Sequence, residues 1–199
     1  MMILLSGCGP ARVSAGEELA LVIRGEYLEQ APWTARAALT ADYGRRVYEY
    51  ELEAAWDGTQ TVLTLTAPET VAGVTARLEA GESLLEYDGT VLETGPLDGE
   101  GLTPLSAIPA LLEAARSGYI TGVLLDEEGG TLRVDCGDPE GEPGEGRETS
   151  LWFDADSHAL TRGEISLDGF RVILCEFAQF TKEARDTHGG EDVEDLGGG

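Results

Sequence analysis

Residues 47–67 read VYEYELEAAWDGTQTVLTLTA, and apolar and polar side chains alternate along this stretch on both sides of a turn. Between Tyr48 and Trp56 every second residue is apolar, and three glutamates lie among the intervening positions. Alternation with a period of two predicts a strand that buries one face. Asp57-Gly58 is a hairpin turn signal, and the threonines after it favour a second strand. The stretch therefore predicts an antiparallel hairpin with one apolar and one charged face.

The same pattern extends outward in both directions along the chain. The period of two begins at Trp33, and the Asp-Gly pairs at 88–89 and 168–169 are further turn signals. Further strands are predicted near residues 74–78, 85–91, 119–125, 132–136, 151–153, 160–167 and 170–180. Residues 138–148 are rich in Gly, Pro and Glu, which indicates a solvated loop. This succession of strands predicts an antiparallel meander.

Two segments change to helical spacing. Ser14, followed three residues later by Glu17, forms a capping box, and the apolar spacing after it predicts a helix over 14–30 that ends before Pro32. A second helix is predicted over 104–116, ahead of Gly118, with Pro109 near its first turn, where proline is tolerated. The predicted fold class is therefore α+β and mainly antiparallel β, with an N-terminal helix and an inserted helix.

The composition limits the classes of partner. With 199 residues, of which 42% are hydrophobic, the chain can bury one core, and we expect a single domain over 8–181. Its 38 acidic residues against 13 basic ones give a formal net charge of -25. Nucleic-acid binding needs clustered Lys and Arg, whereas Lys182 is the only lysine, so we expect no nucleic-acid partner. We interpret residues 182–199 as an acidic, disordered tail.

The N-terminal residues 1–10 read MMILLSGCGP, a short apolar run that leads into Leu5-Ser6-Gly7-Cys8. This tetrapeptide resembles the lipobox of bacterial lipoproteins, in which the thiol is acylated and the chain is cut just before the cysteine. We interpret residues 1–7 as a truncated lipoprotein signal and Cys8 as a lipidated membrane anchor. The alternative is a chance string at a frayed terminus. The lipobox implies an extracytoplasmic lipoprotein of the bacterial cell envelope.

The order of the predicted elements resembles that of the LolA/LolB-like lipoprotein-carrier superfamily. The residues that carry this resemblance are 48–56, 85–89, the helix at 104–116 and Leu151-Trp152-Phe153-Asp154, and it covers about residues 14–181. Gram-positive lipoproteins of this superfamily include some similar to the GerS germination lipoprotein and mycobacterial lipid-binding lipoproteins. The resemblance implies a half-open β-barrel, with helices as a lid, around an apolar concavity that takes a lipid or a lipidated protein.

Two sets of candidate residues follow from this architecture. The apolar strand face is predicted to line a ligand cavity through Tyr48, Tyr50, Leu52, Trp56, Leu63, Leu65, Leu85, Tyr87 and Phe153. The inserted helix is predicted to form the lid through Leu105, Ile108, Leu111 and Leu112. The alternative is that these side chains simply pack the helices against the sheet. Alternation identifies the apolar face, and it leaves open whether that face is hollow or filled.

The remaining candidates concern cysteines and carboxylates. Cys136 and Cys175 lie in strand-like runs and could form a disulfide or stay two buried thiols. The DADSH run at 154–158 offers cation ligands, but it is more typical of a turn whose side chains bond the backbone. Glu49, Glu51 and Glu53 are most simply a solvated strand face, with a calcium strip as the alternative. We therefore expect no metal site and no cofactor.

Catalytic signatures do not stand out in this sequence, which has no G-x-S-x-G, H-E-x-x-H or phosphate-loop pattern. Two of the many carboxylates could still act as acid and base in a hydrolase, but their abundance makes any chosen pair uninformative. We expect a non-enzymatic lipoprotein that binds an apolar ligand. The alternative is a protein-interaction or scaffold lipoprotein of the envelope or spore, with a filled core and an envelope protein as its partner.

Overall fold

The computed structural model describes residues 14–79, 82–95, 101–126 and 128–183. Cys8, the signal at 1–7 and the tail from residue 184 lie outside this part of the chain, so the predictions about them stay predictions. Within the described residues eleven strands form one sheet. They are β1 Trp33–Asp42, β2 Val47–Trp56, β3 Thr61–Ala67, β4 Thr75–Glu79, β5 Glu82–Tyr87, β6 Thr90–Glu93, β7 Ile120–Asp126, β8 Thr131–Cys136, β9 Arg147–Asp154, β10 Leu160–Leu167 and β11 Phe170–Lys182.

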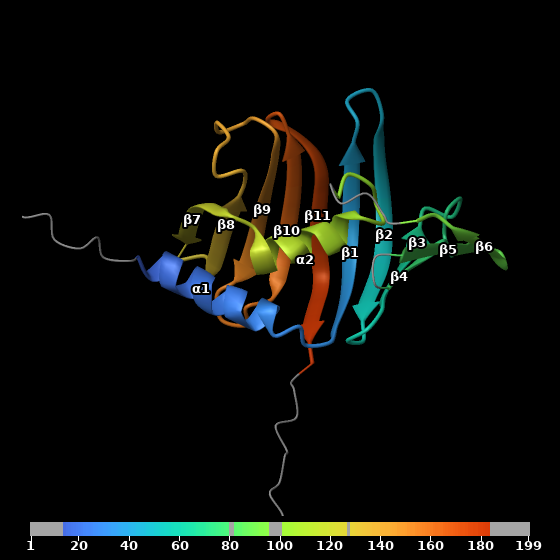
Figure 1. Cartoon of the computed structure of the whole chain (residues 1–199), viewed down its shortest axis with the longest axis horizontal. Helices are drawn as coiled ribbons and strands as arrows, with labels where there is room; N and C mark the ends of the chain where they lie inside the picture. The colour runs from blue at the N-terminus through green and yellow to red at the C-terminus, as the bar shows by residue number, and fades with distance from the viewer. Residues whose placement is uncertain (1–13, 80–81, 96–100, 127, 184–199) are drawn as a thin grey trace, which may run out of the picture.

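The strands follow the order β6-β5-β4-β3-β2-β1-β11-β10-β9-β8-β7, and all neighbours are antiparallel. Only the β1–β11 pair joins strands that are distant in sequence, and it places the first and last strands side by side at the centre of the sheet (Figure 1). The predicted hairpin at 47–67 is confirmed, with Leu52 opposite Leu65. The sheet stays open because β6 and β7 form its two ends.

The two helices begin and end close to the predicted positions. Helix α1 spans Ala15–Leu28, and its capping box is formed as expected: the Glu17 amide donates to Ser14 Oγ, and the Ser14 amide donates to the Glu17 carboxylate. Helix α2 spans Ala107–Ser117. Pro109 lies in its first turn, where the backbone N–H would have no intrahelical partner, so the ring costs no hydrogen bond.

Both helices lie on the same side of the sheet, over the strands nearer its β7 end (Figure 1). Helix α1 contacts β7 and β8, and α2 contacts β9, β10 and β11. Gly163 allows α2 to approach closely, because a Cβ there would lie 2.6 Å from Leu111 Cδ1. The face under the helices is the concave face, and its side chains form the core with Ile108 and Leu111.

The structure leaves Cys136 and Cys175 as free, buried thiols, so the disulfide that the sequence allowed is not formed. Cys136 ends β8 and Cys175 lies in β11, with β9 and β10 between them. Three strand spacings separate the two cysteines by about 14 Å. A disulfide needs its Cα atoms within about 7 Å of each other. The sheet order therefore rules out the bridge within this chain.

The predicted fold class is confirmed: a mainly antiparallel, half-open sheet carries an N-terminal helix and an inserted helix. One boundary was wrong, because Lys182 is the last residue of β11 and not the first residue of a tail. Neither α1 nor α2, the helices of the described part, has the length and apolar character needed to cross a membrane.

Candidate functional site

Four of the predicted cavity residues are part of the packed core. Leu52, Leu63, Leu65 and Phe153 are each at most 5% exposed. Phe153 packs edge to face against Tyr27 of α1, with ring centroids 5.5 Å apart. For these positions the second interpretation of the sequence holds, in which the apolar strand face is filled.

The remaining cavity candidates lie toward the rim of the same face. Tyr48 and Tyr50 stack along β2 with centroids 6.4 Å apart, and Tyr43 joins them at 6.0 Å from Tyr48. The Tyr43 hydroxyl donates to the Leu102 carbonyl at 2.8 Å, which ties this tyrosine row to the segment that leads into α2. Trp56 and Leu85 are half-buried, whereas Tyr87 at the end of β5 is 48% exposed. The structure therefore does not bring all nine candidates into one cavity.

The predicted lid residues face the sheet as expected. Ile108, Leu111 and Leu112 are almost fully buried, and Leu105 is half-buried against the core. These side chains hold α2 down on β9, β10 and β11. The helix therefore covers the concave face in this structure, and its adjoining flank is left to face a hollow.

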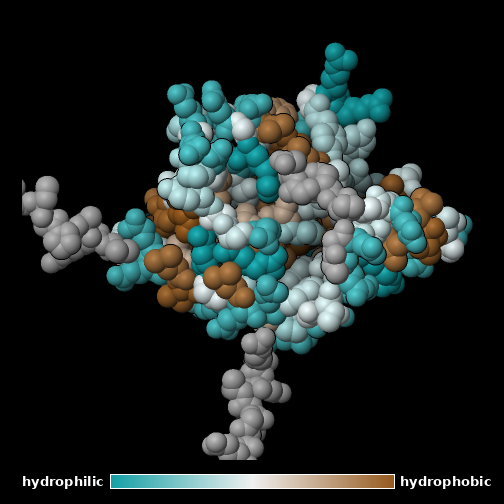
Figure 2. Space-filling model, viewed as in Figure 1, coloured by the Kyte–Doolittle hydropathy of each residue, from teal (hydrophilic) through white to brown (hydrophobic). Residues whose placement is uncertain are grey.

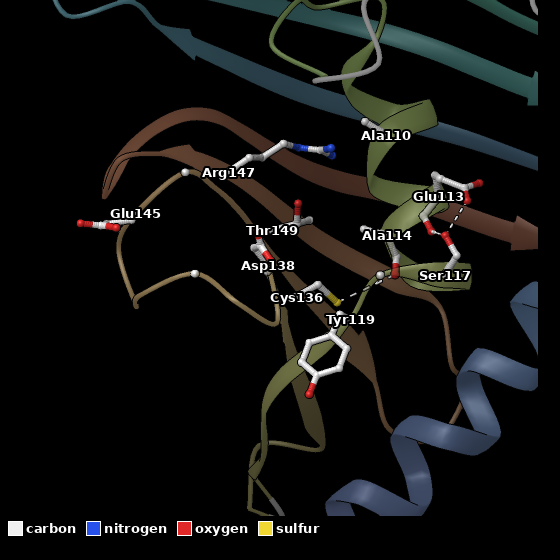
Figure 3. A pocket seen from close by; sticks show the side chains of 14 residues that line it. Ala110, Glu113, Ala114, Ser117, Tyr119, Cys136, Asp138, Glu145, Arg147 and Thr149 are labelled. Carbon is white, nitrogen blue, oxygen red and sulfur yellow. Dashed lines mark hydrogen bonds between the residues drawn. The ribbon is translucent and has the colours of Figure 1, made fainter.

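That hollow, the α2 hollow, lies between α2, the loop 137–146 and the ends of β8 and β9 (Figure 3). Its volume is about 580 Å³, within the range of roughly 300–1,000 Å³ that is usual for small-molecule sites. It is lined by Ala110, Glu113, Ala114, Ser117, Gly118, Tyr119, Cys136, Gly137, Asp138, Gly141, Glu145, Gly146, Arg147 and Thr149.

Small side chains explain why this space is not filled. Six of the fourteen lining residues are alanine or glycine, including Ala110 and Ala114 on the flank of α2. Ala110 and Ala114 are four residues apart, so they lie on the same side of the helix. Cys136 and Thr149, which are buried at the end of the concave face, lie beneath them. The side chains nearest the sheet are therefore small and largely apolar. An alkyl chain fits the chemistry of this space.

The polar groups on the helix side are already engaged. Glu113 accepts hydrogen bonds from the Ser117 hydroxyl at 2.5 Å and from Arg116 at 2.9 Å, and these bonds hold the pKa of Glu113 below its usual value. The Cys136 thiol lies 3.9 Å from the Ala114 carbonyl, and burial raises its pKa. A protonated thiol is a poor nucleophile, so the hollow does not present an activated cysteine.

The outer rim carries opposite charges. Asp138 and Glu145 come from the loop, where the Glu145 side chain points away from α2, and Arg147 extends toward α2 near Ala110 (Figure 3). The loop is held in place because the Gly146 amide donates to the Asp168 carboxylate at 2.9 Å. A second hollow of about 300 Å³ lies on the other side of this loop and shares part of its lining. The rim therefore offers a carboxylate for a positive group of a ligand and a guanidinium for a negative one.

Several residues that the sequence offered as cation ligands make hydrogen bonds or ion pairs within the protein. Asp154 accepts hydrogen bonds from the Ser157 amide and hydroxyl, both at 2.7 Å, and these bonds lower its pKa. His158 Nδ1 lies 2.6 Å from a Glu26 carboxylate oxygen, which directs it away from a shared site. Glu53 pairs with Arg36 at 3.0 Å on the exposed face. Across 14–79, 82–95, 101–126 and 128–183 no group of His, Cys, Asp or Glu is placed to hold a metal.

None of the predicted cavity residues and none of the predicted lid residues lines the α2 hollow. Alternation marks residues as apolar or polar, but the hollow depends on the size of the residues on one flank of α2 and on where the loop 137–146 folds back. A signal is present in the pair Ala110 and Ala114, which places two small residues on one flank of the helix, beside the larger Leu111. The density of glycine in the loop indicates solvation and does not by itself point to a hollow.

Comparisons with known proteins bear on the fold. No family model matches the sequence, and no curated protein matches it. Among solved structures, an uncharacterized conserved protein from Thermus thermophilus has a TM-score of 0.51 at 10% identity, over 85% of this chain and 88% of that one.

Two further structures are similar at lower scores. A LolA superfamily protein from Nitrosomonas europaea has a TM-score of 0.44 at 8% identity, over 87% of this chain and 96% of that one. The Mycobacterium tuberculosis lipoprotein LppX has a TM-score of 0.45 at 14% identity, over 86% and 99%. At these identities the likeness concerns the fold alone. The half-open antiparallel sheet with two helices on one side agrees with the architecture that the sequence resemblance implies.

Proposed function

We propose that this chain is a non-enzymatic, extracytoplasmic lipoprotein that binds an amphiphilic ligand, either a lipid or a lipidated protein, in the α2 hollow. The observation that supports it best is the hollow of about 580 Å³ between α2 and the end of the concave face, with short apolar residues toward the sheet. An alkyl chain placed against Ala110, Ala114 and Cys136 would leave water and fill space that the protein leaves empty.

The charge around the hollow favours a zwitterionic headgroup over an anionic one. Asp138 and Glu145 lie at the rim, and the chain as a whole has a formal net charge of -25. These carboxylates and the negative net charge would repel an anionic lipid, whereas they would attract an ammonium group. Arg147 across the hollow supplies a positive group toward which a phosphate can turn.

Membrane anchoring is the second part of the proposal, and it rests on the lipobox at Cys8. Several acyl chains at one residue would hold an acidic domain at a surface that otherwise repels it. Intact-mass analysis of the protein after expression in a bacterium tests this part directly. The expected mass is that of a chain beginning at an acylated Cys8, and a chain with Met1 retained and an unmodified thiol would contradict it.

Ligand binding is tested by native mass spectrometry of the chain from Cys8 after incubation with phosphatidylethanolamine or phosphatidylglycerol. We expect a retained phosphatidylethanolamine adduct and at least about tenfold less phosphatidylglycerol adduct. Ala114→Leu should abolish the adduct, because the larger side chain enters the hollow. Ala38→Leu is the matched control, since Ala38 is exposed on β1. Unliganded protein under all conditions would contradict this assignment.

A protein-interaction role is the second candidate, and a separate observation favours it. The concave face over β2–β4 is filled, and the adjoining β5–β6 hairpin leaves Tyr87, Val91 and Leu92 about half exposed. Exposed apolar side chains at a sheet edge are typical of a contact surface for another protein. If the hollow binds no lipid, charge substitutions at Val91 and Leu92 become the test, with loss of a partner that copurifies with the unaltered chain as the expected result.

A further inference from the structure

Helix α1 has an apolar face that no described part of the chain covers. Its inner face packs Ala20, Ile23 and Tyr27 into the core. On its outer side Leu21 is 60% exposed, and Val22 and Leu28 are 54% exposed. Figure 2 shows apolar side chains at the surface in the region where Figure 1 places α1 and β7. A surface helix normally keeps its outer face polar, so three exposed apolar side chains here are typical of an interaction surface.

The spacing of these residues places Leu21 and Leu28 on the same side of the helix. Leu21 and Leu28 are seven residues apart, which is two helical turns, and Gly25 lies between them without a side chain. Val22 lies beside Leu21.

The length of chain before α1 limits how far the helix can lie from an anchor at Cys8. Cys8 is six positions before Ser14, the residue that caps the helix. Six residues span at most about 20 Å, which is also about the length of a helix of fourteen residues. An anchor at Cys8 would therefore keep the whole of α1 within reach of the bilayer surface, at a high effective concentration.

We propose that the outer face of α1, formed by Leu21, Val22 and Leu28, docks on the surface of the membrane that holds the Cys8 anchor. This inference rests on the proposed anchor and is independent of ligand binding in the α2 hollow. Docking would fix the orientation of the domain, because the helix would lie along the lipid interface with its apolar side chains among the headgroups and upper acyl chains.

The charges on α1 restrict which lipid surface it can meet. Glu17 and Glu18 lie in the first turn, and Glu29 follows the last residue of the helix. Arg24 does not offset them at the interface, because its guanidinium donates to the Gly118 carbonyl at 2.6 Å. Carboxylates at both ends of the helix are repelled by anionic headgroups and tolerated by zwitterionic ones. The docking surface is therefore a zwitterionic bilayer.

The experiment couples the chain from Cys8 to vesicles through its own thiol. Cys136 and Cys175 are buried, so a maleimide lipid reacts at Cys8. Side-chain exposure is then measured by hydroxyl-radical footprinting on phosphatidylcholine vesicles and compared with the uncoupled chain. We expect the oxidation of Leu21, Val22 and Leu28 to fall at least threefold, and the fall to be lost on vesicles rich in phosphatidylglycerol.

Two variants make the result specific. Leu21→Glu should restore the oxidation of Leu28 to the level of the uncoupled chain, because a charge on this face opposes docking. Val91→Glu is the matched control, since Val91 is similarly exposed but lies on β6 at the opposite end of the sheet, and it should leave the protection of α1 unchanged.

Two outcomes overturn the proposal. Equal oxidation of the coupled and uncoupled chains would show that α1 does not meet the bilayer. Protection that rises with protein concentration without vesicles would assign the face to a second copy of the chain. Because the maleimide replaces natural acylation, neither outcome bears on whether Cys8 is lipidated in the cell, which the intact mass decides separately.

Discussion

The sheet divides into two wings that are built differently. In the covered wing, β7 to β11, both helices lie on the concave face, and this is where the α2 hollow remains. In the open wing, β2 to β6, neither helix makes an extensive contact among the described residues. Its apolar side chains range from fully buried Leu63 to Leu92, which is 59% exposed. The same alternating strand pattern therefore leads to different degrees of burial, depending on which segments lie above the sheet.

This difference shows that the segments above the sheet determine where a hollow remains. Over the covered wing, α2 presents leucines on one side and alanines on the adjoining flank, so one helix both seals the core and borders the hollow. Over the open wing, Leu102 and Leu105 ahead of α2 pack against the core, and the tyrosine row lies at the rim. The proposed ligand site therefore lies in the covered wing, and the proposed protein-contact surface at β5–β6 lies in the open one.

The largest expected effect separates the wings by stability. Leu111→Ala should lower the free energy of unfolding by about 3–5 kcal/mol, because Leu111 is fully buried between α2 and Gly163. Leu92→Ala in the open wing should change it by no more than about 0.5 kcal/mol, since Leu92 is mostly exposed. Urea unfolding followed by circular dichroism measures both. Similar losses for the two variants would mean that Leu92 is packed as closely as Leu111, which would contradict the exposed edge of the open wing.

A smaller effect tests how closely α2 approaches the sheet. Gly163→Ala would place a Cβ 2.6 Å from Leu111 Cδ1, and we expect a loss of about 1–3 kcal/mol from overpacking. Gly25→Ala is the matched control, because a Cβ at Gly25 meets nothing within 4 Å and alanine favours the helix. That control should gain about 0.5–1 kcal/mol in the same unfolding measurement. A neutral Gly163→Ala would show that α2 can move away from β10 at little cost, as a lid would.

The sequence predicted the sheet better than the site, for a physical reason. The strands, both helices and the capping box at Ser14 depend on local pattern and on backbone hydrogen bonding, which neighbouring residues determine. The hollow depends on how α2 settles on strands that are distant in the chain and on which small residues then face the loop 137–146. Cys136 and Cys175 show the same limit, because only the sheet order reveals that two strands separate them.

The smallest effect concerns the contact that holds α1 on the covered wing. Glu26 on α1 lies 2.6 Å from Lys182 Nζ at the end of β11 and 2.6 Å from His158 Nδ1, and Lys182 also lies 4.5 Å from the centroid of the Tyr27 ring. Burial raises the pKa of Glu26, but the hydrogen bonds from Lys182 and His158 outweigh it and hold this pKa below its usual value.

A lowered folded pKa means that the contact stabilises the protein above the pKa of the unfolded carboxyl and that this contribution is lost as pH falls through the folded value. Lys182→Met should therefore lower the free energy of unfolding by about 1 kcal/mol at pH 7, since the pair is partly exposed, and by less at an acid pH below the folded pKa of Glu26, where this carboxyl is protonated in either protein. Urea unfolding at the two pH values measures the difference. A loss that is equal at both would mean that Lys182 acts through its contact with the Tyr27 ring, and that the carboxylate of Glu26 does not hold α1 on the sheet.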